Sequence, residues 1–384
     1  MKAVKIALPA VIVIHAAASF FAAPGCFAQE NEAYDSSFSL NLSTNYDDNL
    51  FQSNAFEAPD SHFSMNLAAD FTYSPSLRTS YSLSIEHTQN DYSENTGEDH
   101  SITSVELSRA HGLSGSTTGV FEFYYETLDA GAASLLNYSY DETDISYSLK
   151  HAPGGRGLFK ATVGAQDENY NQMDELNFGG RYYKVDWTRE LPGFSYLELT
   201  YTGEVVNYPA VPVISPFEDE TGETRRDRAG TFTAIYSRTL AVYPLRYVEV
   251  TLEKKQVSST STYLYKWFTP AGLDSKFVSG YDSYDDLAVS LYYMRSLSSR
   301  ATLHLYYLRE KTEYANYLVE AFPPLSEPTE PVTLKLTYVT GRLTYAVGDG
   351  LNLEFSVSAA RNRADDELLS YSQRTHSLGF NVVF

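Results

Sequence analysis

The sequence predicts an all-β protein that forms a transmembrane antiparallel β-barrel of about 16 strands. Three observations support this prediction. Apolar and polar residues alternate with a period of two along most of the chain, the connections between the alternating segments are short and long in turn, and the last segment ends on the aromatic residue Phe384. Such alternation is typical of strands with one lipid-facing and one water-facing side.

The alternating segments follow one another from residue 37 to the end of the chain. In chain order they are Ser37–Asp47, His62–Tyr73, Arg78–Thr88, Ser101–Ala110, Thr117–Thr127, Ile145–Lys150, Leu158–Gln166, Asn177–Arg189, Ser195–Val206, Ala229–Arg238, Arg246–Val257, Asp286–Arg295, Ala301–Lys311, Val332–Val347, Leu351–Ala360 and Tyr371–Phe384. For Ile145–Lys150 the alternative is an earlier start, near Tyr138. Bacterial barrels have an even number of strands, as this series does. In Val332–Val347 the apolar positions change face after Tyr338, which predicts a β-bulge near Gly341; the alternative is two short strands.

The connections are sorted by length. The short ones are rich in Gly, Pro and Ser, residues that suit tight turns, and they are Tyr73–Ser76, His111–Gly115, Ala152–Gly155, Glu190–Gly193, Tyr243–Leu245, Ser296–Ser299 and Gly348–Gly350. The others are polar, and Asn207–Arg228 and Ser258–Asp285 are the longest. Bacterial barrels have short periplasmic turns and long external loops, so we expect both termini on the periplasmic side. A soluble sheet, the alternative, has no reason to sort its loops in this way.

The last segment is the expected closing strand. Leu378, Phe380, Val382 and Phe384 share one face. Unpaired backbone groups in lipid cost several kcal/mol each, so the last strand of a membrane barrel has to pair with the first, here Ser37–Asp47. The terminal Phe384 also resembles the signal that the barrel-assembly machinery reads, which makes this machinery an expected partner.

The first 28 residues have the pattern of a secretory signal peptide. Lys2 and Lys5 precede an apolar stretch, and small residues lead to a predicted cleavage between Ala28 and Gln29. Residues 29–36 are then a short tail and 37–384 the barrel. Cys26 is the only cysteine, so no disulfide is expected; it is alternatively a lipidated residue, although no Leu precedes it as in a good lipobox.

The composition argues against a helical membrane protein and against a nucleic-acid-binding protein. Beyond residue 28 there is no apolar stretch of the length that a membrane-spanning helix requires. The net charge is −21, and loss of Lys2 and Lys5 with the signal peptide makes it more negative, so the chain is a poor binder of nucleic acid.

A segment near the front resembles a known family. Leu42–Phe51, with the sequence LSTNYDDNLF, is similar to the opening strand of outer-membrane β-barrel porins of Gram-negative bacteria, some of which accompany exopolysaccharide systems. The resemblance implies a location in the cell outer membrane and polysaccharide or small solutes as ligands. Within the segment, Asp47, Asp48 and Asn49 either form an Asx-type turn or ligate a cation.

If the apolar face contacts lipid, the opposite face lines the lumen. The predicted pore-lining acids are Glu86, Glu106, Glu122, Glu126, Asp186, Glu198, Glu204, Glu249, Glu253 and Glu354, and the predicted pore-lining bases are Lys160, Lys184, Lys255 and Lys335. A barrel of this size leaves an aqueous channel, and an excess of carboxylates favours cations. The alternatives are that acids and bases only pair across strands, or that one of the two longest loops plugs the lumen.

Aromatic residues with the lipid-facing parity are expected at the membrane interfaces. They include Tyr73, Tyr183, Trp187, Tyr293 and Tyr338. Inward Tyr124, Tyr182, Tyr292 and Tyr306 are alternatively sugar-stacking residues. Outer-membrane lipid and lipopolysaccharide are expected partners, and the acidic loops either bind lipopolysaccharide phosphates through divalent cations or form a solvated rim.

Catalysis is not expected. His62 and Ser64 share the lumen face of one segment, as in a barrel hydrolase, yet no residue is recognisable in the sequence as the partner that orients the base. No metal-ligand spacing occurs, so neither a metal nor a cofactor is predicted. The sequence therefore predicts a porin-like channel for passive passage of small hydrophilic solutes. The alternatives are a closed or plugged accessory barrel associated with exopolysaccharide export or surface binding, and a hydrolase.

Overall fold

The computed structural model describes residues 33–48, 59–95, 98–130, 138–155, 157–215, 220–269, 272–318, 330–348, 350–365 and 369–383. The predicted cleavage site at Ala28 and Gln29 and the terminal Phe384 lie outside the described residues. The strands are β1 Ala33–Asp47, β2 Asp60–Ser76, β3 Thr79–Tyr92, β4 His100–Gly112, β5 Thr117–Ala130, β6 Tyr140–His151, β7 Gly157–Tyr170, β8 Phe178–Leu191, β9 Ser195–Ile214, β10 Glu220–Ala241, β11 Arg246–Ser259, β12 Thr262–Thr269, β13 Gly272–Ser279, β14 Tyr284–Ser296, β15 Ala301–Leu318, β16 Pro331–Gly348, β17 Leu351–Ala364 and β18 Tyr371–Val383.

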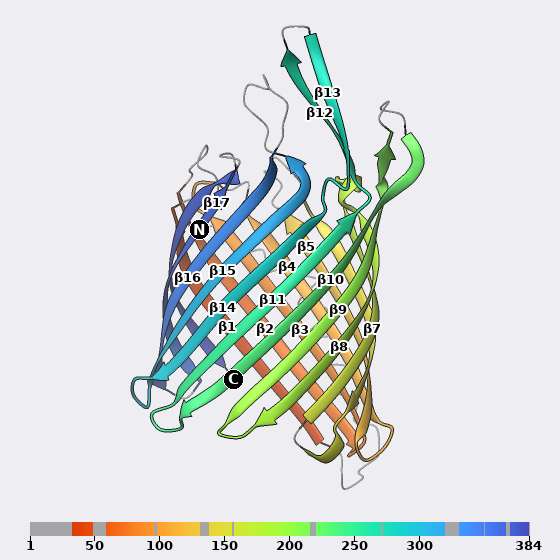
Figure 1. Cartoon of the computed structure of the whole chain (residues 1–384). Helices are drawn as coiled ribbons and strands as arrows, with labels where there is room; N and C mark the ends of the chain where they lie inside the picture. Colours follow the sequence, from red (N-terminus) through yellow and green to blue (C-terminus); the bar gives the residue numbers. More distant parts are fainter. Residues whose placement is uncertain are drawn as a thin grey trace.

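All strands except β12 and β13 form one closed antiparallel barrel of 16 strands, as the alternating pattern predicts. Strands adjacent in sequence pair around the barrel, and the described part of Figure 1 shows them strongly tilted against its axis. Closure brings β18 beside β1, with Leu42 opposite Phe380 and Leu40 opposite Val382. The predicted seam between the first and the last strand is therefore confirmed.

Strands continue into regions that were expected to be connections. β12 and β13 pair with each other inside the predicted loop Ser258–Asp285, while β9 and β10 extend to Ile214 and Glu220 inside the predicted loop Asn207–Arg228. β1 also begins at Ala33 and not at Ser37. Both extended hairpins stand above the barrel at its long-loop end (Figure 1). The described parts of the two longest predicted loops thus project away from the lumen.

The base of the β12–β13 hairpin has a small core of its own. Tyr265 is 1% exposed, and its hydroxyl accepts a hydrogen bond of 2.6 Å from the backbone nitrogen of Leu318 on β15. Val278 and Tyr281 pack against this pair. Alternation in Tyr263–Tyr265 is visible in the sequence, but only these contacts with β15 show that the segment forms an anchored hairpin.

The predicted bulge near Gly341 is wrong. Gly341 lies opposite Leu305 of β15 and Val357 of β17, and neither register shifts there. β16 therefore runs without a change of parity, so Leu334, Leu336 and Tyr338 are on the face opposite to Leu343. The large apolar residues of β16 therefore lie on the inner face up to Tyr338 and on the outer face from Val339 onward.

The start of the first barrel strand, β1, and the end of the last, β18, both lie on the side of the short turns. Ala33 pairs with Ser74, next to the first turn, and β18 runs from the 365–370 connection toward that same side. This is the side that the loop lengths predict to be periplasmic. Within the described residues, none of the helical segments combines the length and the apolar content needed to cross a membrane.

Candidate functional site

The inner wall of the barrel is the candidate site, and the strand register decides which residues form it. Directly opposite residues of an antiparallel pair project to the same face, and the face alternates along each strand. Phe121, Val163 and Leu291 are 45%, 61% and 44% exposed on one continuous face. We take this face as the outer one, because a barrel in lipid presents its large apolar side chains outward.

The register places nearly all of the predicted pore residues on the inner face. These are Glu86, Glu106, Glu122, Glu126, Lys160, Lys184, Asp186, Glu198, Glu204, Glu249, Glu253, Lys255 and Glu354. The exception is Lys335, which lies opposite Lys311 and Arg363 on the outer face. This prediction is wrong for the same reason as the bulge, because a continuous β16 reverses the assumed parity of its first half.

Of the aromatic residues predicted at the membrane interfaces, all but Tyr338 are on the outer face. Tyr73, Tyr183, Trp187 and Tyr293 are on the outer face, and Tyr73 stacks with Tyr34 at a ring distance of 4.6 Å. Tyr338 is instead on the inner face, where its ring centroid lies 6.0 Å from that of Tyr306. Its assignment to the membrane interface is therefore corrected.

The most concentrated charge on the inner wall is a patch that we call the acid–tyrosine wall. It comprises Glu126 on β5, Glu142 and Asp144 on β6, Glu168 on β7, and the tyrosines Tyr124, Tyr140, Tyr170 and Tyr182. Glu126 lies directly opposite Glu142, which in turn lies directly opposite Glu168. Three carboxylates in one row across adjacent strands repel one another, an arrangement that does not serve stability.

Tyrosine hydroxyls hold two carboxylates of this wall, Glu126 and Asp144, in place. Tyr124 and Tyr140 both donate to Glu126, the latter at 2.7 Å, and Tyr182 donates to Asp144 at 2.9 Å. Each bond presents a neutral donor to the carboxylate, so the wall keeps its negative charge while the positions of the oxygen atoms are fixed. The chemical result is a rigid anionic surface that faces the lumen.

Sequence reasoning missed Glu142, Asp144 and Glu168 as wall residues. It assigned them to loops, because the apolar alternation of β6 becomes clear only at Ile145 and that of β7 ends near Gln166. In the structure β6 begins at Tyr140 and β7 ends at Tyr170. The alternative start near Tyr138 agrees with the structure, and the period-two spacing of Tyr140, Glu142 and Asp144 is the signal that favours it.

A second inner feature is a pocket of about 240 Å³ near the long-loop end, on β9, β10, β11 and β14. Its centre is Arg225, which contacts Asp227 at 2.6 Å and Asp282 at 2.8 Å, and whose guanidinium carbon lies 4.4 Å from the centre of the Tyr208 ring. Ser259 also donates to Asp227 at 2.5 Å. The charge of Arg225 is thus balanced by two carboxylates, and the pocket carries no strong net charge of its own.

Other inner charges pair locally. Lys184 lies 3.4 Å from Asp186, and Arg342 lies 3.8 Å from Glu354. Across the described barrel strands the inner basic residues are Lys150, Lys160, Lys184, Arg225, Lys255 and Arg342, fewer than the inner acids. The local pairs therefore leave the acid–tyrosine wall without basic partners among the described residues.

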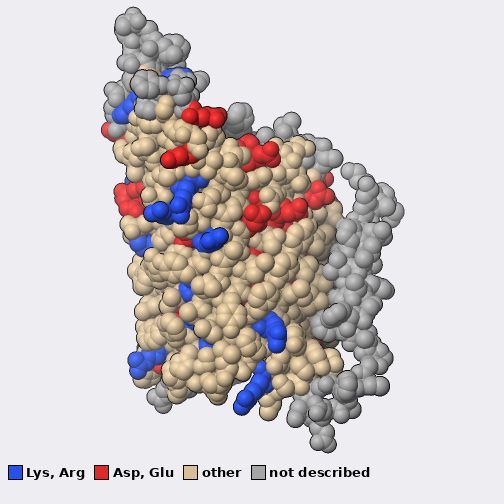
Figure 2. Space-filling view, turned by 90° about the vertical axis from the view of Figure 1, so that its right-hand side faces the viewer, with Lys and Arg blue, Asp and Glu red and all other residues tan. Residues whose placement is uncertain are grey.

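The loop end of the barrel is also acidic. In the side of the barrel that Figure 2 draws, Asp and Glu gather in the upper part, toward the end that carries the β12–β13 hairpin. In one such contact Tyr138 donates to Glu98 at 3.1 Å and links two connections. Burial and this hydrogen bond raise the pKa of Tyr138 to about 12.

The His62 and Ser64 pair has a partner that the sequence did not reveal. Asn45 on β1 lies 3.0 Å from Nε2 of His62, and all three residues are on the inner face. Among the described residues no hydrogen bond joins Ser64 to His62, so the nucleophile of a Ser-His-Asn site is not engaged. The described residues also contain no group of three or more His, Cys, Asp or Glu side chains placed to hold a metal ion.

No protein-family model and no curated protein matches the chain. Among solved structures, it is similar to in-vitro folded OmpT, an outer membrane protein of Vibrio cholerae, with a TM-score of 0.51 and 10% identity over 93% of this chain and 99% of that one. It is also similar to OccAB1 of Acinetobacter baumannii, with a TM-score of 0.50 and 9% identity over 91% of this chain and 96% of that one. At this identity the likeness shows the fold, which is that of the outer-membrane β-barrels.

Proposed function

We propose that the protein is a channel of the outer membrane through which small hydrophilic solutes diffuse, with a preference for cations. The observation that carries the proposal is the acid–tyrosine wall, in which Glu126, Glu142 and Glu168 form one row facing the lumen. A barrel of this strand number is wide enough for an aqueous passage, and a lumen lined by carboxylates concentrates cations. No chemical step or cofactor is involved.

Two structural features support an open passage. The described parts of the two longest predicted loops stand above the barrel and do not enter it (Figure 1). Glu126 and Asp144 accept hydrogen bonds from tyrosines, and among the described residues no ion pair joins a carboxylate of the wall to a basic residue, so the charge of the wall is available to mobile ions. Because ions screen charges within about 10 Å at 0.1 M salt, the selectivity should be largest at low ionic strength.

The test is the reversal potential of single channels in planar bilayers under a salt gradient. The wild-type protein should conduct with a cation-selective reversal potential, and the Glu126→Gln/Glu142→Gln/Glu168→Gln variant should shift that potential toward zero. The matched control is Asp129→Asn/Asp141→Asn/Asp167→Asn, which removes the same charge from the outer face of the same three strands. Absence of conductance at every voltage, or equal shifts in both variants, would contradict the proposal.

A second candidate is a polysaccharide-binding role for the hairpin. Tyr263 is 38% exposed and stacks on Tyr281 with a ring distance of 4.6 Å, a surface on which a sugar ring could stack. We propose that Tyr263 contacts polysaccharide at the barrel mouth. Replacing it by Ala should abolish retention of uncharged polysaccharide on the purified barrel while conductance is unchanged; unaltered retention would remove this candidate.

We propose that a signal peptide is cleaved between Ala28 and Gln29 and that the barrel-assembly machinery recognises Phe384. Mass spectrometry of the mature chain tests the first, because it reads the N-terminal residue directly. Deletion of Phe384, followed by measurement of the folded fraction in outer membranes, tests the second.

A further inference from the structure

The polarity of the wall is inverted over one sector at the long-loop end. On β15 and β16 the inner face carries Leu308, Leu334, Leu336 and Tyr338, with Glu310 opposite Leu336. The outer face carries six exposed basic residues that we call the outer cationic sector: Arg309, Lys311, Lys335, Arg361, Arg363 and Arg374. A lipid-facing surface does not tolerate such a group of charges within hydrocarbon, so the sector must face another environment.

The residues of the sector are direct neighbours across strands. Lys311 lies opposite Lys335, and Lys335 lies opposite Arg363. Arg361 is the next outward-facing residue below Arg363 on the same strand, β17. Directly opposed like charges repel, so this row is unfavourable unless an anion lies against it.

The sector lies just above the apolar outer band. On β16 the nearest large apolar outer residue is Val339, which is 48% exposed and four residues from Lys335. At about 3.3 Å per residue and a strand tilt of about 40°, Lys335 stands roughly 10 Å above Val339 along the barrel axis. That height corresponds to the headgroup region of the membrane and not to the hydrocarbon.

Few carboxylates neutralise the basic side chains of the outer cationic sector. Lys311 contacts Glu313 at 2.5 Å, but no ion pair with a described carboxylate involves Arg309, Lys335, Arg361, Arg363 or Arg374. Other outer bases do have such partners, for example Lys254, which lies 3.6 Å from Asp285. Arg226 and Arg228 on β10 are also exposed outer bases without such a partner, so what distinguishes the sector is its row of directly opposed bases, Lys311, Lys335 and Arg363.

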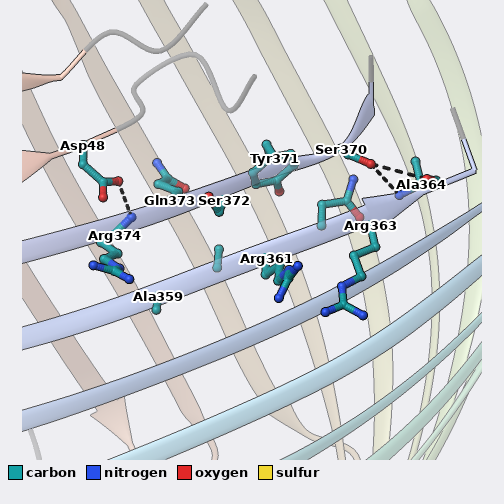
Figure 3. Close-up of a pocket in the computed structure, with 12 residues that line it drawn as sticks. Asp48, Ala359, Arg361, Arg363, Ala364, Ser370, Tyr371, Ser372, Gln373 and Arg374 are labelled. Atoms are coloured by element: carbon teal, nitrogen blue, oxygen red, sulfur yellow. Dashed lines mark hydrogen bonds between the residues drawn. The ribbon is translucent and has the colours of Figure 1, made fainter. Parts of the chain in front are cut away.

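Part of the sector borders a groove of about 760 Å³ where β1 stops and β18 continues. Figure 3 shows Arg361 and Arg363 on β17 and Arg374 on β18 around it. Asp48 accepts a hydrogen bond of 2.5 Å from the backbone nitrogen of Arg374 and lies at one edge. Guanidinium groups from two strands can bind one phosphate through several charge-assisted hydrogen bonds.

We propose that the outer cationic sector binds the phosphate groups of the phosphorylated glycolipid in the outer leaflet. The acyl chains of that lipid lie against the apolar band below, and its phosphates meet Lys335, Arg361 and Arg363 at headgroup height. The proposal rests on the position of the barrel in the outer membrane and does not depend on conductance through the lumen.

The experiment compares three probes on the full mature chain in detergent micelles: lipid A with both phosphates, the same lipid without phosphates, and inorganic phosphate. Each basic residue beside an anionic lipid surface contributes about a fivefold factor in affinity, so Lys335→Ala/Arg361→Ala/Arg363→Ala should bind phosphorylated lipid A about 100-fold more weakly than wild type. The matched control is Arg189→Ala/Arg238→Ala/Arg295→Ala, which removes the same charge from the outer face near the turns and should bind as wild type does.

The outcomes are distinct. Preference of the wild type for phosphorylated lipid A, lost in the sector variant and regained by about fivefold when Lys335→Arg replaces Lys335→Ala in that variant, supports the proposal. Equal binding by the sector variant, or equal affinity for lipid A without phosphates, overturns it. Binding of inorganic phosphate as tightly as lipid A overturns the lipid assignment, and loss of an oligomer without loss of lipid binding shows instead an interface between subunits.

A folding control keeps these results interpretable. Folded barrels migrate differently on gels before and after heating, and the sector and control variants are compared only at equal folded fractions. If the alanine variant does not fold, Arg361→Gln/Arg363→Gln retains long polar side chains and should still weaken binding of phosphorylated lipid A about 25-fold. Binding by this variant at the wild-type level contradicts the proposal.

Discussion

Tyr182 on β8 donates a hydrogen bond of 2.9 Å to Asp144 on β6, across the whole width of β7. The bond is possible because the residue between them is Gly164, and a Cβ at this position would overlap the Tyr182 ring. The acid–tyrosine wall therefore depends on a glycine that carries no functional group. A strand glycine here marks close approach by a neighbouring side chain.

Gly164→Ala should displace Tyr182 and release Asp144. We expect the free energy of unfolding to fall by about 1–3 kcal/mol, the usual cost of inserting a methyl group into an occupied space. Urea unfolding in detergent measures it. Gly341→Ala is the control, because the nearest atom to its Cβ would be Leu305 Cδ2 at 3.6 Å. Equal losses in the two variants would show that the ring is not held over Gly164.

Gly379→Ala should impair closure of the barrel. The added Cβ would lie 2.9 Å from the backbone oxygen of Leu42 and from Cβ of Ser43, so β18 could approach β1 only with a shift of the backbone. We expect a smaller folded fraction in outer membranes, read from gel migration before and after heating. Gly348→Ala, with no atom within 4 Å of the added Cβ, should assemble normally. Normal assembly of Gly379→Ala would contradict the tight seam.

Arg225→Ala should destabilise the upper wall through Asp227, which is 8% exposed and would lose its ion pair. Hydrogen bonds to charged groups are worth about 1.5–3 kcal/mol, so we expect a loss of about 2 kcal/mol. The outward neighbour Arg226→Ala is the control. In a double-mutant cycle with Asp227→Ala, the two losses should not be additive, because the residues act as a pair. Additive losses would show that the ion pair contributes nothing.

The faces of β16 can be tested with single cysteines, since Cys26 lies in the predicted signal peptide. Tyr338→Cys should react rapidly with a water-soluble thiol reagent from the lumen. Val339→Cys, on the outer apolar face, should be protected when the barrel is in lipid. Reaction rates in proteoliposomes give the comparison. Protection of Tyr338→Cys together with rapid reaction of Val339→Cys would instead indicate a bulge near Gly341.

The strand series and its closure could be predicted because they follow from local chemistry. Ser37–Asp47 and Tyr371–Phe384 each show period-two alternation, and each predicts a strand without knowledge of its partner. Lipid on one side and water on the other then require a closed sheet. For the same reason the inner placement of Glu86, Glu198 and Glu249 followed from parity alone.

The tertiary structure decided what alternation leaves open. Alternation is informative only where one face meets lipid and the other meets water, and it weakens or reverses beyond the apolar band. That is why Glu142 and Glu168 were assigned to loops and why Lys335 was assigned to the lumen. Pairing with neighbouring strands extends the first two into the acid–tyrosine wall and turns Lys335 outward. The sequence by itself determined a 16-stranded membrane barrel, whereas only the register between strands determined which charges meet.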